Sequence, residues 1–219
     1  MVNTNRTNKT NKPFKSRPPL VRLSIPNEFL WAFIGLILTI FSTFLDAFIT
    51  NLPWTWLNQG VRSYSLGVTY QIGAVLLTGC MGGQNAGLLS QTAYVLLGLT
   101  WLPVFAQGGG WGYLLEPSFG YLLGFIPGGW LCGFLAFRRR TNLESLAFSA
   151  ICGLVVIHLC GLLYLVGLSL FIPTVHQTIP ISSLPMAIFN YSIIPFPGQL
   201  VIICAVALLS LILRRLLFY

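Results

Sequence analysis

Charged residues are scarce in this chain of 219 residues: they make up 7% of it, and only four are acids. Soluble domains carry about 25% charged residues, so the composition excludes an ordinary soluble domain. Hydrophobic residues make up 55% of the chain, and the mean hydropathy is +0.79. The apolar runs are continuous rather than alternating, which favours membrane-spanning helices over a β-barrel.

The motifs of several common enzyme classes are also absent. The sequence has no GxxxxGK[ST] phosphate loop, no HExxH zinc motif and no GxSxG nucleophile motif. The two histidines, His158 and His176, are isolated, and the five cysteines lie in or beside apolar runs without CxxC spacing. Such cysteines are typical of small buried side chains rather than of metal ligands. We therefore expect a protein that is not an enzyme and holds no metal or cofactor.

Six apolar runs approach the roughly 20 residues that a membrane span needs. They cover residues 29–50, 64–80, 87–102, 119–137, 143–172 and 198–217. Only residues 81–86 separate the short second and third runs, so the count can change by one. The sequence predicts an all-α membrane protein: a single six-helix membrane domain, residues 27–219, behind a basic, flexible tail, residues 1–26. A transit peptide is the alternative interpretation of the tail.

The basic residues test this count. If six spans are drawn, all of the twelve lysines and arginines except Arg62 fall on one side of the membrane. The positive-inside rule makes that side cytoplasmic. We expect both termini in the cytoplasm and a multi-pass protein of the cell membrane. Because the basic residues form juxtamembrane clusters, they indicate topology, and we expect no nucleic-acid partner.

The same orientation places three long loops outside, at residues 51–63, 103–118 and 173–197. Long loops over a helical bundle indicate a pocket that opens outward, whereas an aromatic belt with ordinary turns is the alternative. Segment 106–112 is rich in glycine, which lets backbone approach a ligand closely. Glu116 follows this segment, and Gln199 falls in the first turn of the last span, where its amide can donate and accept hydrogen bonds. His158 is more typical of a hydrogen-bonded core histidine than of a proton carrier.

Four stretches together resemble one family. Residues 87–98 follow the pattern G-x-x-S-x-x-x-Y-V-L-L-G, residues 102–106 read LPVFA, residues 108–114 read GGGWGYL, and residues 117–121 follow P-x-x-G-Y. This series resembles the BioY family, the biotin-capturing S subunits of energy-coupling factor (ECF) transporters. The likeness covers about residues 60–137 and returns at residues 195–198, Pro-Phe-Pro-Gly, before the last span.

The resemblance implies a six-helix bundle of the ECF S-component type that captures biotin from outside. It also implies a transmembrane coupling subunit and two ATPase subunits as partners, besides membrane lipid. ATP would then be used by those partners, in agreement with the absent phosphate loop. Glycines 108–110 are expected to act as a hinge for loop closure, and the small residues Ala32 and Gly35 to meet the coupling subunit.

The chain departs from the family where the ligand is concerned. Members carry Asp, and Lys three positions later, at the start of the last helix; here these positions are Gln199 and Ile202, and Glu116 replaces a glycine. We expect Gln199 to replace the Asp as a hydrogen-bond acceptor. A different vitamin or biotin-like ligand, an intramembrane enzyme using His158 or Glu116, and a purely structural subunit remain alternatives. The candidate ligand contacts are Gln91, Tyr94, Gly109, Trp111, Glu116, Tyr121, Asn190 and Gln199.

Overall fold

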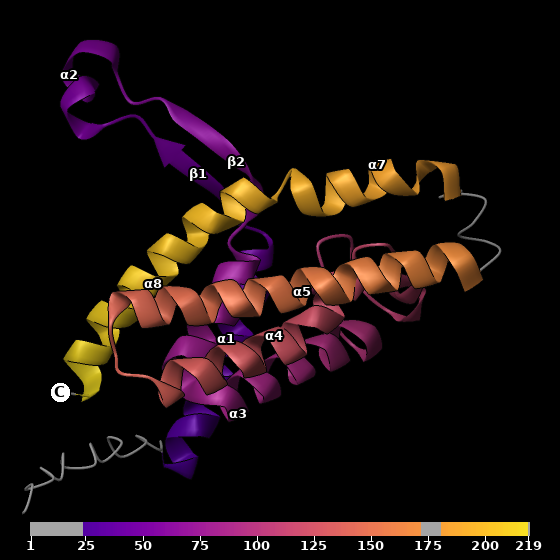
Figure 1. The fold of residues 1–219 in the computed structure, drawn as a ribbon, viewed down its shortest axis with the longest axis horizontal. Coiled ribbons are helices and arrows are strands. Elements are labelled where there is room, and N and C mark those ends of the chain that lie inside the picture. The colour runs from indigo at the N-terminus through magenta and orange to yellow at the C-terminus, as the bar shows by residue number, and fades with distance from the viewer. Residues whose placement is uncertain (1–23, 172–180, 219) are drawn as a thin grey trace, which may run out of the picture.

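The computed structural model describes residues 24–171 and 181–218, which form a bundle of long apolar helices (Figure 1). The long helices are α1 (Ile25–Thr43), α3 (Gln71–Thr100), α4 (Phe119–Arg138), α5 (Leu143–Phe171) and α8 (Phe196–Phe218). Five helical segments of the described residues are long and apolar enough to cross a membrane. The fold is therefore all-α in its membrane part, as the composition predicts.

Helix α3 supplies two of the six expected spans, because the chain reverses at Gly83. Gly83 has φ +80° and ψ −172°, a conformation that breaks the helix and that residues with a side chain rarely adopt. Gln71 Nε2 donates to Tyr94 Oη at 2.9 Å across 23 residues, whereas a straight helix would hold the two residues about 34 Å apart. Gly79 and Gly87, on opposite sides of Gly83, both lie against Gly129 of α4. The expected turn within residues 81–86 is confirmed.

The first outer loop is a β-hairpin that the sequence did not predict. Strand β1 (Asp46–Thr50) pairs antiparallel with β2 (Ser63–Thr69), and the short helices η1 (Pro53–Thr55) and α2 (Trp56–Gln59) form its tip. The expected first and second spans were therefore wrong at these ends, because α1 stops at Thr43 and α3 starts at Gln71. Strand β1 contains Phe, Ile and Thr, and β2 contains Tyr, Val and Thr; these residue types favour strands, but an apolar run alone does not distinguish a strand from the end of a helix.

The last span is preceded by a second helical segment. The short helices η3 (Ile181–Ser183), α7 (Leu184–Ile188) and the π-helical η4 (Phe189–Ile193) come before α8, with a turn at residues 194–195. Pro195 and Pro197 lack a backbone N–H, so they interrupt the helical hydrogen bonds and favour a helix start. Both α7 and α8 pack against α5. The expected start of the last span, Gly198, lies in the first turn of α8.

Glycines allow α4 to pack closely on its neighbours, as predicted for this span. A Cβ at Gly124 or Gly128 would lie within 3.0 Å of α5 atoms, and one at Gly133 would lie 2.3 Å from the backbone of Gly83. Glycine also packs α1 on α3, because a Cβ at Gly35 would meet the side chain of Thr78. Gly35 and Ala32 are buried within the chain. The expectation that these two residues form a surface for another subunit is therefore wrong.

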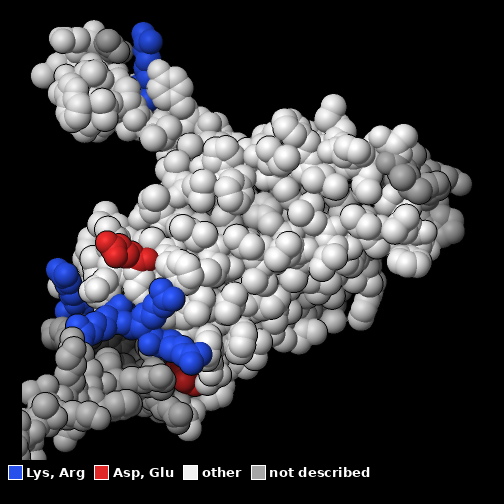
Figure 2. All heavy atoms as spheres, in the orientation of Figure 1, with Lys and Arg blue, Asp and Glu red and all other residues white. Residues whose placement is uncertain are grey.

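Basic residues gather at one end of the molecule (Figure 2). Arg138 ends α4, Arg139 and Arg140 follow it, and Arg214 and Arg215 lie in the last turns of α8. Arg62 lies between α2 and β2, in the β-hairpin, and Figure 2 shows basic atoms on the hairpin apart from the cluster. This arrangement agrees with the one-sided pattern in the sequence. Residues 1–23 of the expected tail, the end of the fifth span at Ile172, and His176 lie outside the described residues, while α1 begins at Ile25, within the last residues assigned to that tail.

Candidate functional site

Four hydrogen-bonded side chains meet where the last span is interrupted. His158 of α5 has its Nε2 2.6 Å from Gln199 Oε1 and its Nδ1 3.2 Å from Ser192 Oγ. Tyr121 Oη of α4 lies 2.6 Å from the same Ser192 Oγ. This group of four, here called the polar chain, joins α4, α5, η4 and α8. Polar groups inside a membrane bundle are costly unless they are hydrogen-bonded, and those that persist often mark a ligand path.

Aromatic rings surround the imidazole of the polar chain. The rings of Tyr121 and Phe196 lie 5.6 Å and 5.7 Å from the His158 ring, both in edge-to-face geometry. Tyr191 lies beside Tyr121, with ring centres 6.4 Å apart and planes 26° from parallel. Apolar walls exclude water and strengthen the hydrogen bonds that they enclose. The polar chain is thus a small polar centre with aromatic walls.

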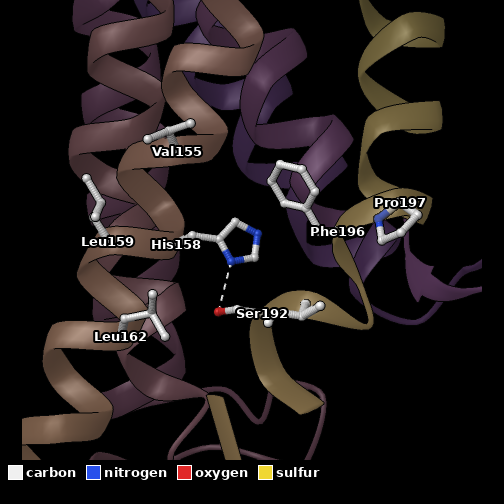
Figure 3. Close-up of a pocket in the computed structure, with 8 residues that line it drawn as sticks. Val155, His158, Leu159, Leu162, Ser192, Phe196 and Pro197 are labelled. Atoms are coloured by element: carbon white, nitrogen blue, oxygen red, sulfur yellow. Dashed lines mark hydrogen bonds between the residues drawn. The ribbon is translucent and has the colours of Figure 1, made fainter. Parts of the chain in front are cut away.

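A pocket of about 410 Å³ adjoins the polar chain, between α5 and the segment that joins η4 to α8 (Figure 3). His158 and Ser192 border it, but its accessible lining is almost entirely apolar; the other lining residues are Val155, Leu159, Leu162, Ile193, Phe196 and Pro197. Small-molecule sites usually have volumes of about 300–1,000 Å³ and apolar walls with a few placed polar groups. The pocket therefore has the size and chemistry to hold a small, largely apolar molecule.

Several predicted site residues meet at this place. Gln199 and Tyr121 belong to the polar chain, and Asn190 is an exposed residue of η4. Glu116 is half-buried and lies close enough to Tyr191 for its charge to act on the tyrosine. The structure thus brings Tyr121 and Gln199 into one hydrogen-bonded group and Glu116 near its edge, whereas no hydrogen bond joins Asn190 to that group among the described residues.

Tyr94 and Gln91 lie in a different polar network. Both side chains are fully buried, and Tyr94 Oη donates to the Val104 carbonyl at 3.0 Å. Tyr94 Oη also lies 3.2 Å from Thr43 Oγ1, and Gln91 Nε2 donates to Thr39 Oγ1 at 3.0 Å. These bonds tie α1 to α3 and to the loop after α3. Among the described residues, no hydrogen bond joins this network to the polar chain.

The glycine-rich loop is fixed to the end of α3. The Gly110 N–H donates to the Gly98 carbonyl at 2.8 Å, and a Cβ at Gly109 would lie 2.6 Å from the same oxygen. Phe105 is buried, while Trp111 is 68% exposed. Within the part of the chain that the structure describes, no hydrogen bond links Gly109 or Trp111 to the polar chain. Their part in ligand binding, and the hinge at residues 108–110, stay predictions.

Ser192 is the member of the polar chain that sequence reasoning missed. A serine in an outer loop has no spacing or motif that marks it, and only the fold brings it to His158 and Tyr121. His158 is a hydrogen-bonded core histidine, as expected. Its isolation in an apolar span is the signal in the sequence that marks it as a candidate for a functional role.

The fold and the site define a class: a multi-pass helical membrane protein with an internal polar centre beside a pocket for a small molecule. The chain belongs to the BioY family, whose model matches residues 27–218.

Similar proteins agree with this assignment. The "Probable biotin transporter BioY" of Lysinibacillus sphaericus is 41% identical over 98 residues, which are 44% of this chain and 50% of that protein. The "Biotin transporter BioY" of Thermotoga maritima is 34% identical over 56% of this chain and 70% of its own. The crystal structure of the "S-component for biotin from an ECF-type ABC transporter" aligns with a TM-score of 0.63 at 19% identity, over 89% of this chain and 95% of that one. The fold is that of an ECF S component, and these relatives are named as transporters, not enzymes.

Proposed function

We propose that this chain captures biotin at the outer face of the cell membrane, as the substrate-binding subunit of an ECF-type transporter. The family match over residues 27–218 carries the proposal. The polar chain and its pocket support it, because they place polar groups beside an apolar space of suitable size. A transmembrane coupling subunit and two ATPase subunits would assemble with the chain, and their ATP hydrolysis would drive uptake.

The chemistry of biotin suits this arrangement. The molecule has two ureido N–H donors, one carbonyl acceptor, an apolar ring system and a carboxylate on an alkyl chain. The aliphatic and aromatic lining of the pocket suits the ring and the alkyl chain, and the polar chain suits the urea or the carboxylate. None of the described residues that line this pocket is a cation, and Ile202 stands where the family pattern has a lysine. The carboxylate is therefore expected to meet neutral donors such as Asn190 or water.

Direct binding tests the proposal. The full-length protein in lipid nanodiscs should bind biotin saturably in isothermal titration calorimetry. Tyr121→Ala and Gln199→Ala should each weaken binding by about 10-fold or more, because each leaves polar-chain partners unsatisfied. Tyr64→Ala, on the exposed hairpin, is the matched control and should bind like the wild type. No detectable binding of biotin or its precursors would reject this ligand.

A different vitamin or biotin-like ligand is the second candidate, and Gln199 with Ile202 is the observation that favours it. Mass spectrometry of the small molecule that co-purifies with the protein separates the two. Recovery of biotin supports the first proposal, and recovery of another ligand supports the second.

A further inference from the structure

The geometry of the polar chain assigns its hydrogen atoms. With the Gln199 amide oriented as in the structure, its Oε1 faces His158 Nε2 at 2.6 Å; because a carbonyl oxygen only accepts, this orientation requires that Nε2 carries a proton and donates it. A neutral imidazole with this proton has a lone pair on Nδ1, which accepts from the Ser192 hydroxyl at 3.2 Å. The Ser192 oxygen in turn accepts from the Tyr121 hydroxyl at 2.6 Å. The imidazole proton and both hydroxyl protons then each have an acceptor.

The other protonation states fit worse. With the proton on Nδ1, the Nε2 lone pair would face the lone pairs of Gln199 Oε1 at 2.6 Å, which is repulsive. Ser192 would then accept from His158 and donate to Tyr121, whose own proton would have no acceptor in the polar chain. A doubly protonated ring would place a cation among apolar walls, at a high desolvation cost.

Gln199 consequently has one polar group in use and one available. Its carbonyl accepts from His158, whereas no described residue accepts from its Nε2 amide group. The residue is only 6% exposed, but its Nε2 is not among the fully buried polar atoms that lack a partner, so this amide group reaches open space where a ligand or water can accept from it. The sequence predicts Gln199 as an acceptor in place of an aspartate; the structure shows that its acceptor is already taken.

We infer that His158 is a positioning residue that holds the Gln199 carbonyl and leaves the Gln199 NH₂ group to meet the ligand. The site then selects an acceptor oxygen at this position, and not the N–H donor that an acidic side chain would select. This inference rests on the proposed function. In biotin the acceptor is either the ureido carbonyl or the carboxylate, and both offer the same chemistry to an amide N–H.

The first test needs no ligand. His176→Asn leaves His158 as the sole histidine of the full-length chain, so ¹⁵N-histidine labelling reports its ring alone. The expected spectrum in nanodiscs shows a neutral ring with the proton on Nε2 and none on Nδ1. A proton on Nδ1, or on both nitrogens, would overturn the assignment. This result is independent of whether biotin binds.

The second test removes the donor and keeps the shape. Gln199→Glu replaces the amide N–H₂ with a second acceptor oxygen, and biotin affinity should fall about 10-fold or more. Gln84→Glu makes the same change at the opposite, Gly83 end of the bundle and should leave affinity unchanged. Equal biotin affinity of wild type and Gln199→Glu would overturn the inference even though biotin binds. If the wild type does not bind biotin, both the proposed function and the contact between Gln199 and the ligand are rejected. The position of the His158 proton is decided separately, by the first test.

Two analogues identify the oxygen. In 2-iminobiotin an imino group replaces the ureido oxygen, and in biotinol an alcohol replaces the carboxylate. If the ureido oxygen contacts Gln199, the difference in affinity between wild type and Gln199→Glu persists for biotinol and shrinks for 2-iminobiotin. If the carboxylate contacts Gln199, the difference in affinity persists for 2-iminobiotin and shrinks for biotinol. A difference that persists undiminished for both analogues would overturn the assignment of a ligand oxygen to this amide.

Discussion

Arg214 is buried, although it belongs to a cluster that the charge pattern assigns to the membrane surface. Its side chain is 5% exposed and donates to the carbonyls of Cys80, at 2.8 Å, and Ala136, at 3.0 Å. Both carbonyls lie in the last turn of a helix, the first half of α3 and α4, where no helical N–H remains to pair with them. One guanidinium thus caps two helix C-termini, where a positive charge also suits the helix dipoles.

Removal of this cap should destabilise the bundle. Arg214→Met leaves two carbonyls without their donor and should lower the free energy of unfolding by about 3 kcal/mol. Arg214→Lys should fall between it and the wild type, because an ammonium lacks the fork that reaches both carbonyls. The exposed neighbour is the control: Arg215→Met should stay within about 0.5 kcal/mol of the wild type. Thermal unfolding in detergent measures all three, and equal midpoints for the Arg214 and Arg215 variants would contradict the capping role.

The site residues that sequence predicts are those whose chemistry is rare in their surroundings. Gln199 and Tyr121 are polar groups at the ends of apolar spans, so the order of residues alone is enough to mark them. Ser192 is not marked in this way, since its role depends on a turn that brings η4 back against α5. Tyr94 and Gln91 are marked equally well, but the structure places them in the separate network between α1 and α3, where Gln91 Nε2 is hydrogen-bonded and Gln91 Oε1 has no partner among the described residues.

The helix boundaries in the structure match the predicted ones where the end of an apolar run coincides with a glycine or proline. Glycine at position 83 and prolines at 195 and 197 mark the two breaks that shape the bundle, and both fall close to the predicted boundaries. The β-hairpin was not predictable from hydropathy, because its strands are as apolar as the helix ends that they extend. Helix α7 was assigned to a loop since its five residues are too few to form a span.

The contact between α4 and the reversal of α3 can be tested with a single methyl group. In Gly133→Ala the new Cβ would lie 2.3 Å from the Gly83 carbonyl carbon, so the two elements must separate. We expect a loss of about 2–3 kcal/mol. Gly167→Ala adds the same group to α5 where no described atom lies within 4 Å, and the higher helix propensity of alanine should leave stability unchanged or slightly raised. Unfolding midpoints that do not separate the two variants would contradict the close packing.

At the scale of the whole molecule, the described cationic residues divide between one end of the bundle and the β-hairpin (Figure 2). If the cluster end faces the cytoplasm, as the positive-inside rule requires, the hairpin, the glycine-rich loop and the interrupted last span face outward. In this orientation the pocket would be reached from outside, as the proposed capture of biotin requires. The orientation also requires that α3 crosses the membrane twice. If α3 crossed once, the hairpin and the loop after α4 would lie on the same side of the membrane.

Cysteine labelling tests orientation and span count together. Leu57, 96% exposed at the hairpin tip, and Arg139, exposed after α4, each become cysteine in turn, with the wild type as control for the native thiols. Three crossings separate these positions if α3 reverses at Gly83, and two if it does not. A membrane-impermeant maleimide should therefore label Leu57→Cys in intact cells, and Arg139→Cys only after the membrane is opened. Labelling of both variants in intact cells would contradict the reversal at Gly83. Labelling of Arg139→Cys alone in intact cells would agree with six spans but invert the orientation. The polar chain would then be beyond the reach of an external ligand.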